Sequence, residues 1–197
     1  MFRGPEVSVP VLHAIAGPNG AGKTTYYDRV VRPATGLAFI NADHIAAQRW
    51  PDAPAEHAYA AAELAATTRE NLIADRRSFA TETVFSHPSK LELLQAANAG
   101  GYRVYLHVVL IPQELAVARV AVRVETGGHD VPEEKIRARY VRLWGLLRHA
   151  IALVDDARVF DNSRAKTPFR LVATYRRGQL LGDPDWPSWT PPGLHLD

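Results

Sequence analysis

The sequence predicts an α/β fold in which helices cover both faces of a parallel core sheet, giving three layers. Apolar, strand-like runs alternate with helical patterns along the chain, which is typical of a parallel sheet. The first of these runs, residues 9–16, leads into a glycine-rich loop at residues 17–25. A length of 197 residues suits one well-packed domain, so we expect a single domain over residues 1–197.

Each expected element has its own signal in the sequence. Apolar runs predict strands at residues 9–16, 36–43, 78–84, 102–111 and 158–162. Helical patterns occur at about residues 24–32, 55–77, 88–99, 113–125 and 132–154. Pro88 stands at the favoured first position of its helix, and Gly100-Gly101 ends that helix. A hairpin is expected over residues 169–181, and the proline-rich tail, residues 183–197, is expected to be extended.

The glycine-rich loop carries the strongest functional signal. It reads Gly-Pro-Asn-Gly-Ala-Gly-Lys-Thr-Thr and matches the phosphate-loop (P-loop) pattern G-x-x-x-x-G-K-[ST] without a gap. In such a loop, backbone N–H groups and the start of the next helix attract phosphate oxygens. We therefore expect ATP to bind here, with Lys23 on its β- and γ-phosphates and Thr24 on Mg²⁺. The expected nucleotide contacts are Gly17, Pro18, Asn19, Gly20, Ala21, Gly22, Lys23, Thr24 and Thr25.

Polar residues follow several of the expected strands. Ligands of open parallel sheets bind beyond the carboxyl ends of the strands, so we expect Asp43, Glu82 and Asn162 at one edge. Asp43 could accept the proton of an acceptor hydroxyl, or it could only cap the next helix. Glu82 could bind substrate or join the Mg²⁺ shell, or be a solvated acid, and Thr83 could add a hydroxyl contact. No strand ends in a Walker B acid, so the metal-side carboxylate must come from Asp43 or Glu82, or be replaced by waters.

Arginines concentrate around a glycine pair late in the chain. They surround the segment of residues 126–132, and they are Arg119, Arg123, Arg137, Arg139 and Arg142. Guanidinium groups on a mobile segment can stabilise the charge of a transferring phosphoryl group and exclude water. We expect a helical lid at about residues 119–140, with Arg123 and Arg139, then Arg119, closest to ATP. The alternative is a basic helix pair exposed to solvent.

Composition excludes several kinds of function. The chain has no cysteine, so disulfides and thiolate catalysis are excluded. A net charge of +2 does not call for a nucleic-acid partner. There is no long apolar stretch and no secretory signal pattern, so a cytoplasmic enzyme or binding module without a membrane segment is expected.

Taken together, these motifs resemble the zeta toxin family of P-loop kinases. The resemblance rests on the loop with its flanks, Asn41-Ala-Asp43, Thr81-Glu-Thr83, the arginine-rich lid and Asp161-Asn-Ser163, over roughly residues 10–165. Zeta toxins transfer the ATP γ-phosphate to UDP-N-acetylglucosamine, and several are paired with an inhibitory antitoxin. The resemblance implies that Asp43 is the base, that Glu82 is a substrate-side acid and that Asn162 lies near the adenine.

Three other functions fit the same loop. A kinase of this fold could act on another nucleotide-like metabolite, such as a dinucleotide cofactor. A nucleotide-dependent switch or slow ATPase could act on a protein partner instead of a metabolite. Phosphorylation of nucleic-acid 5′ ends is the third, although the near-neutral charge disfavours it.

Overall fold

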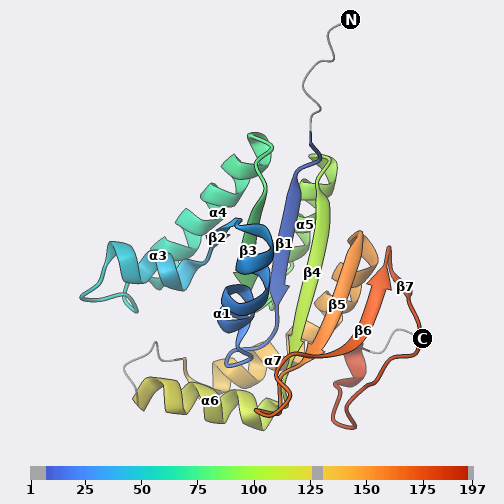
Figure 1. Cartoon of the computed structure of the whole chain (residues 1–197). Helices are drawn as coiled ribbons and strands as arrows, with labels where there is room; N and C mark the ends of the chain where they lie inside the picture. Colours follow the sequence, from blue (N-terminus) through green and yellow to red (C-terminus); the bar gives the residue numbers. More distant parts are fainter. Residues whose placement is uncertain (1–7, 126–130, 195–197) are drawn as a thin grey trace, which may run out of the picture.

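A computed structural model describes residues 8–125 and 131–194 of the chain. Within these residues one seven-stranded sheet has the order β2-β3-β1-β4-β5-β6-β7 (Figure 1). The strands are β1 (Val11–Ala16), β2 (Ala38–Ile40), β3 (Phe79–Thr83), β4 (Arg103–Leu110), β5 (Asp156–Asp161), β6 (Arg170–Arg176) and β7 (Gln179–Leu180). The strands from β2 to β5 pair in parallel, and β6 and β7 add an antiparallel edge. The prediction of a parallel core sheet is confirmed.

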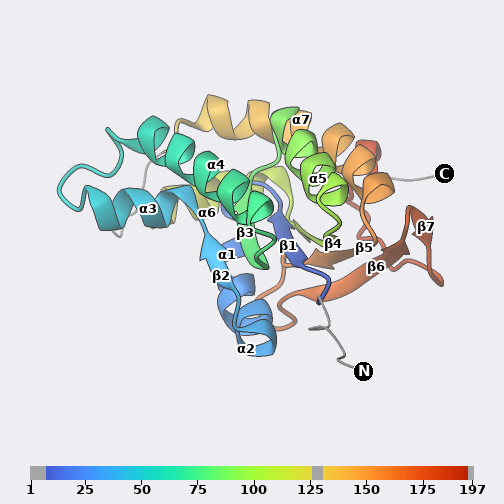
Figure 2. The ribbon, with the colours of Figure 1, turned by 90° about the horizontal axis from the view of Figure 1, so that it is seen from above.

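Helices cover both faces of this sheet. Figure 2 shows α4, α5 and α7 on one face, and α1 and α2 on the other. The helices are α1 (Lys23–Tyr26), η1 (Tyr27–Val31), α2 (Arg32–Thr35), α3 (Ala42–Arg49), α4 (Ala58–Ala74), α5 (Ser89–Ala99), α6 (Gln113–Glu125), α7 (Glu133–Leu153) and η2 (Pro192–Leu194). The three layers are thus as predicted.

The core lies between the sheet and these helices. Strand β4 runs through its centre, and all but two of its eight residues are buried because a strand covered on both faces is apolar along its length. Helix α7 contributes Leu143, Leu147 and Ile151 from one stripe, at the spacing of a helix face. This rigid packing fixes the carboxyl ends of the strands, where the loops of the site begin.

Some predicted boundaries are wrong, and so is part of the predicted extended tail. The second strand ends at Ile40 and not at residue 43, because Asn41 caps a new helix and turns the chain. The predicted helix at residues 55–77 is shorter, since α4 spans only Ala58–Ala74. The described part of the tail, which was expected to be extended, contains a short 3₁₀ turn, Pro192–Leu194, and this turn begins with proline because its fixed φ suits a first helical position.

None of the helices formed by residues 8–125 and 131–194 combines the length and the apolar character needed to cross a bilayer.

Candidate functional site

The P-loop follows the carboxyl end of β1. At this strand the connections of the sheet change direction, so that some run to one side of β1 and some to the other. Strand β3 lies on one side of β1 and β4 on the other, which opens a crevice at this end. Gly17 has φ 152°, and a Cβ there would meet the Val109 carbonyl oxygen at 2.4 Å. Gly22 has φ 85°, and a Cβ there would lie 2.8 Å from Asn162 Nδ2. Glycine is therefore required at both positions.

The start of α1 places its two polar side chains beside Glu82. Lys23 is 6% exposed, and its Nζ donates to the Pro18 carbonyl oxygen at 3.0 Å. The same Nζ lies 3.8 Å from a Glu82 carboxylate oxygen. Thr24 Oγ1 donates to the other carboxylate oxygen of Glu82 at 2.7 Å. Glu82 is therefore a neighbour of the P-loop and not an isolated strand-end acid.

Two side chains from distant segments hold the loop from outside. Asn162, after β5, donates from Nδ2 to the Ala21 carbonyl oxygen at 2.8 Å. Arg119 of α6 donates to the Gly20 carbonyl oxygen at 3.4 Å and to the Asn162 carbonyl oxygen at 3.0 Å. Arg119 therefore contacts the base of the loop directly, whereas we expected it in a lid above the phosphates.

A cavity of about 310 Å³ opens over the loop. It is lined by Asn19, Gly20, Gly22, Lys23, Thr24, Thr25, Asp43, Glu82, Val84, Arg119 and Arg123. Burial lowers the pKa of Lys23, the charges of Glu82 and Asp43 raise it, and those of Arg123 and Arg139 lower it. These residues are thus close enough to interact electrostatically, and Lys23 has both acidic and basic neighbours.

A second cavity, of about 260 Å³, adjoins the first. It is lined by Asn41, Ala42, Asp43, Ala62, Ala65, Arg69, Glu82, Thr83, Val84, Phe85, Ser86, Lys90 and Arg139. Asp43, Glu82 and Val84 line both cavities. A group bound in one cavity would therefore meet a group bound in the other beside the two carboxylates.

Asp43 reaches this position from a helix and not from a strand end. Asn41 caps α3, and its Oδ1 accepts from the backbone N–H groups of Asp43 at 2.8 Å and His44 at 3.3 Å. Because Asn41 is the cap, the alternative that Asp43 serves as the cap is wrong. The carboxylate of Asp43 is exposed and available to a ligand.

The residues present suit a magnesium nucleotide. Mg²⁺ prefers oxygen ligands and usually binds through one or two protein groups together with phosphates and water. The Thr24 hydroxyl and the Glu82 carboxylate supply such oxygens at the end of the P-loop. No group of three or more His, Asp or Glu side chains in the described part of the chain could hold a metal by itself, so the phosphates would complete the shell.

The predicted arginines divide into two groups. Arg119 and Arg123 line the first cavity and Arg139 lines the second. Arg137 instead pairs with Glu114, over 2.5 Å, and with Glu133 at the exposed surface. Arg142 is exposed on α7. The expected glycine corner of the lid, residues 126–130, lies outside the described residues.

Arg69 and Lys90 both line the second cavity and were not predicted from the sequence as site residues. A signal for Arg69 is visible in hindsight. Ala61, Ala65, Arg69 and Leu72 are the buried residues of α4, and their spacing places the arginine on the inward stripe of the helix. Lys90 carries no comparable signal, because a lysine in the first turn of a helix is common at protein surfaces.

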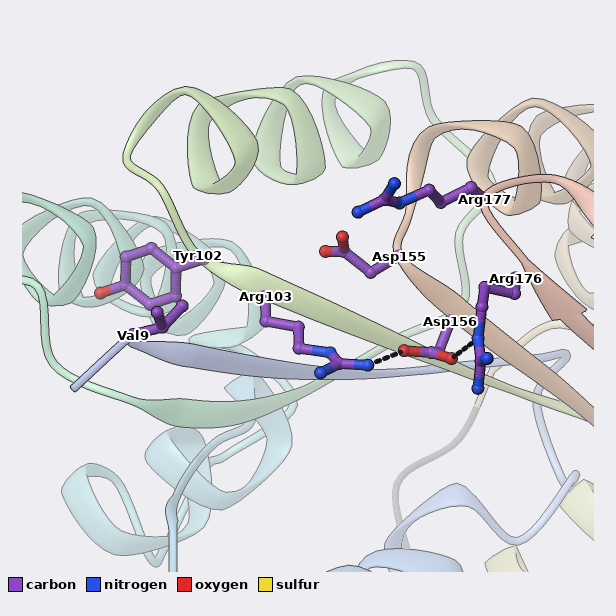
Figure 3. Close-up of a pocket in the computed structure, with 7 residues that line it drawn as sticks. All are labelled: Val9, Tyr102, Arg103, Asp155, Asp156, Arg176 and Arg177. Atoms are coloured by element: carbon purple, nitrogen blue, oxygen red, sulfur yellow. Dashed lines mark hydrogen bonds and ion pairs between the residues drawn. The ribbon is translucent and has the colours of Figure 1, made fainter.

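A further cavity, of about 490 Å³, lies at the opposite end of the strands from the P-loop, where β1, β4 and β5 begin. Figure 3 shows Asp156 there between Arg103 and Arg176. Asp156 lies 2.9 Å from Arg103 Nη2 and 3.4 Å from Arg176 Nε, and Asp155 accepts from the Val104 N–H. These charges satisfy one another, which indicates a structural role at the strand ends.

Comparison with known proteins places the chain in a family. A family model described as an AAA domain matches residues 12–142, which is more than half of the chain. The chain belongs to this AAA domain family. An uncharacterized protein of Haemophilus influenzae is 30% identical to this AAA domain protein over 125 residues, covering 63% of this chain and 88% of the relative.

Solved structures show the fold of this AAA domain protein. A structure of AvrRxo1-ORF1:-ORF2 with ATP matches with a TM-score of 0.70 at 17% identity, over 89% of this chain and 61% of that one. A structure of the PezAT toxin-antitoxin system of Streptococcus pneumoniae matches at 0.65 and 17% identity, covering 85% and 71%. Shikimate kinase of Acinetobacter baumannii with shikimate matches at 0.53 and 20%, covering 80% and 86%. The fold is that of P-loop kinases, and the chain spans less than two thirds of the AvrRxo1 chain.

Proposed function

We propose that this protein is an ATP-dependent kinase of a small molecule. The observation that carries this proposal is the pair of adjoining cavities with Asp43 and Glu82 at their junction. A nucleotide on the P-loop directs its terminal phosphate toward the junction, and an acceptor occupies the second cavity. A nucleotide switch needs only the first cavity, so the second one favours transfer over hydrolysis.

The transfer step follows from this arrangement. The acceptor hydroxyl oxygen bonds to the γ-phosphorus as the bond from phosphorus to the β,γ-bridging oxygen breaks, and ADP leaves. The hydroxyl proton goes to the Asp43 carboxylate, which is exposed at the junction. Lys23 donates to the phosphate oxygens in place of the Pro18 carbonyl, and Arg123 and Arg139 stabilise the developing charge.

Mg²⁺ would be held by Thr24 and by Glu82, directly or through water, and would neutralise phosphate charge. The protein's part is to hold these oxygens in place. Arg119 and Asn162 hydrogen-bond to the backbone of the loop from outside and so help to fix the shape of the phosphate cradle. Such preorganisation is the main contribution a protein makes to phosphoryl transfer.

The preferred acceptor is UDP-N-acetylglucosamine or a related UDP-amino sugar. The zeta-toxin-like motifs of the sequence support this choice, and the structural likeness to the PezAT toxin-antitoxin system supports a toxin-type fold. An antitoxin partner is part of the same proposal. Toxicity and its inhibition would follow from the phosphorylation of a cell-wall precursor.

The test is a transfer assay with a panel of acceptors. The protein and the Asp43→Ala variant are incubated with Mg-ATP and UDP-sugars, dinucleotides or short oligonucleotides, and phosphate gain is followed by mass spectrometry. We expect a phosphorylated UDP-amino sugar, with transfer about 10²–10⁴-fold slower in the variant. ADP formation with no modified acceptor, unchanged in Asp43→Ala, would instead identify an ATP-driven switch.

A further inference from the structure

Arg69 is a buried cation in the second cavity. Its residue is 8% exposed, and it reaches the cavity wall from the inward face of α4. Its side chain forms no hydrogen bond or ion pair with any residue in 8–125 or 131–194. Arginine is almost never this buried without a partner, because removing its charge from water is costly.

Lys90 approaches the same cavity from the first turn of α5. Burial and the positive charge of Arg69 both lower the pKa of the Lys90 ammonium. The two cations are therefore near each other and repel, and Lys90 likewise has no side-chain bond or ion pair within the described residues. A third cation, Arg139, lines the cavity from α7.

The acids of this cavity do not neutralise the pair. Glu82 is engaged with Thr24 and Lys23, and Asp43 lies in the first turn of α3 without an ion pair to Arg69 or Lys90. Glu70, the carboxylate that acts on the pKa of Arg69, is exposed on the same helix. Two desolvated positive charges thus face a cavity that supplies no counter-charge to them.

Small neighbours leave room for a ligand beside the pair. Ala62 and Ala65 line the cavity from α4, two turns and one turn before Arg69. An arginine fork can bind two oxygens of one phosphate or carboxylate, and a lysine can add a point charge to the same group. The two cations line one cavity, and their charge is complementary to that of an oxyanion.

We propose that Arg69 and Lys90 form an anion-binding subsite that holds a phosphate or carboxylate group of the phosphoryl acceptor. The acceptor is therefore an anionic metabolite with a free hydroxyl, and neutral sugars and polyols are poor substrates. That the bound anion belongs to a phosphoryl acceptor rests on the proposed kinase function. Anion binding by Arg69 and Lys90 does not depend on that function, so the two proposals can be tested separately.

Binding is tested first, with the P-loop filled by Mg²⁺ and a non-hydrolysable ATP analogue. Inorganic phosphate, pyrophosphate and malonate are then titrated calorimetrically. We expect at least one probe to bind, and the preferred probe distinguishes a phosphate from a carboxylate. Arg69→Met, which keeps an unbranched apolar chain in the buried site, and Lys90→Met should each weaken binding by tenfold or more. Arg148→Ala, which removes an exposed charge elsewhere on α7, should leave binding unchanged.

The transfer assay provides the second test. UDP-N-acetylglucosamine is compared with free N-acetylglucosamine, which has the same sugar hydroxyls without the diphosphate. We expect transfer to the first only, and a tenfold or larger rise in the acceptor KM in Arg69→Met with little change in the KM for ATP.

The outcomes separate the two proposals. Equal probe affinity in wild type, Arg69→Met and Lys90→Met, or no probe binding at all, would overturn the subsite even if the protein is a kinase. Loss of probe binding in both variants, with no acceptor phosphorylated, would leave the subsite standing and overturn the kinase function. Circular dichroism of each variant checks folding, and Lys90→Met tests the subsite from the less buried side.

Discussion

Thr24 donates its hydroxyl hydrogen to Glu82 over 2.7 Å and so joins the first turn of α1 to the carboxyl end of β3. These residues are 58 positions apart in the chain, and they meet because β3 lies beside β1 in the sheet. This hydrogen bond places the Thr24 hydroxyl and the Glu82 carboxylate together beside Lys23. This pair is the structural basis of the proposed magnesium site.

Glu82→Gln removes the charge of this pair and keeps its shape. We expect the Mg²⁺ concentration for half-maximal ATP turnover to rise by about tenfold or more, since changes around a metal commonly weaken its binding by 10–100-fold. The measurement is ADP release against Mg²⁺ at saturating ATP. Glu114→Gln is the matched control, because Glu114 pairs with Arg137 at the surface. An unchanged Mg²⁺ dependence in Glu82→Gln would exclude Glu82 from the metal shell.

Asn41→Ala removes the cap of α3. We expect a loss of about 1 kcal/mol in the free energy of unfolding, because two N–H groups at the start of the helix lose their acceptor. Asn41→Asp, another good cap, should recover most of this loss. Urea unfolding followed by circular dichroism measures both. If Asn41→Ala is as stable as wild type, the cap does not hold the turn that carries Asp43.

Arg119→Ala removes the hydrogen bonds to the carbonyl oxygens of Gly20 in the P-loop and of Asn162 beside it. Hydrogen bonds to charged groups contribute about 1.5–3 kcal/mol, and the partial exposure of Arg119 favours the low end. We therefore expect ATP affinity to fall by roughly tenfold, measured by calorimetry. Arg142→Ala, at an exposed position of α7, serves as the control. Unchanged ATP affinity in Arg119→Ala would show that the loop keeps its shape without this brace.

A buried histidine pair predicts that stability falls in acid. Burial lowers the pKa of His107 to about 3, and burial also lowers that of His13 to about 4. The unfolded chain, with histidine pKa values near 6.5, binds more protons than the folded chain between these limits. The histidine contribution is therefore complete above about pH 6.5 and is lost as the pH falls toward 3–4.

His107→Gln tests this expectation. His107 accepts or donates at both ring nitrogens, at 2.9 Å to His13 and 3.0 Å to Tyr26, and glutamine keeps polar atoms without titrating near neutral pH. Each histidine contributes a slope of at most about 1.4 kcal/mol per pH unit. Urea unfolding between pH 4 and 7 should give a shallower slope for the variant. An equal slope in both proteins would assign the acid sensitivity to other groups.

The sequence by itself determined the layers of the fold and the P-loop. Both are local in origin: strand and helix periods recur within a few residues, and the loop needs glycines and a lysine at fixed spacing. The rule for parallel sheets then placed Asp43, Glu82 and Asn162 at one edge, and the structure finds all three near the carboxyl ends of the strands.

Tertiary structure alone decided which side chains meet. Arg119 contacts the loop backbone, 99 residues away, because α6 packs beside the P-loop. Arg69 and Lys90 lie on separate helices and share a cavity only once α4 and α5 both pack on the sheet. Such contacts depend on helix packing over long chain separations, and no short sequence pattern encodes that packing. The nucleotide side and the two carboxylates at the junction were therefore predictable from the sequence, whereas the cation pair of the acceptor side was not.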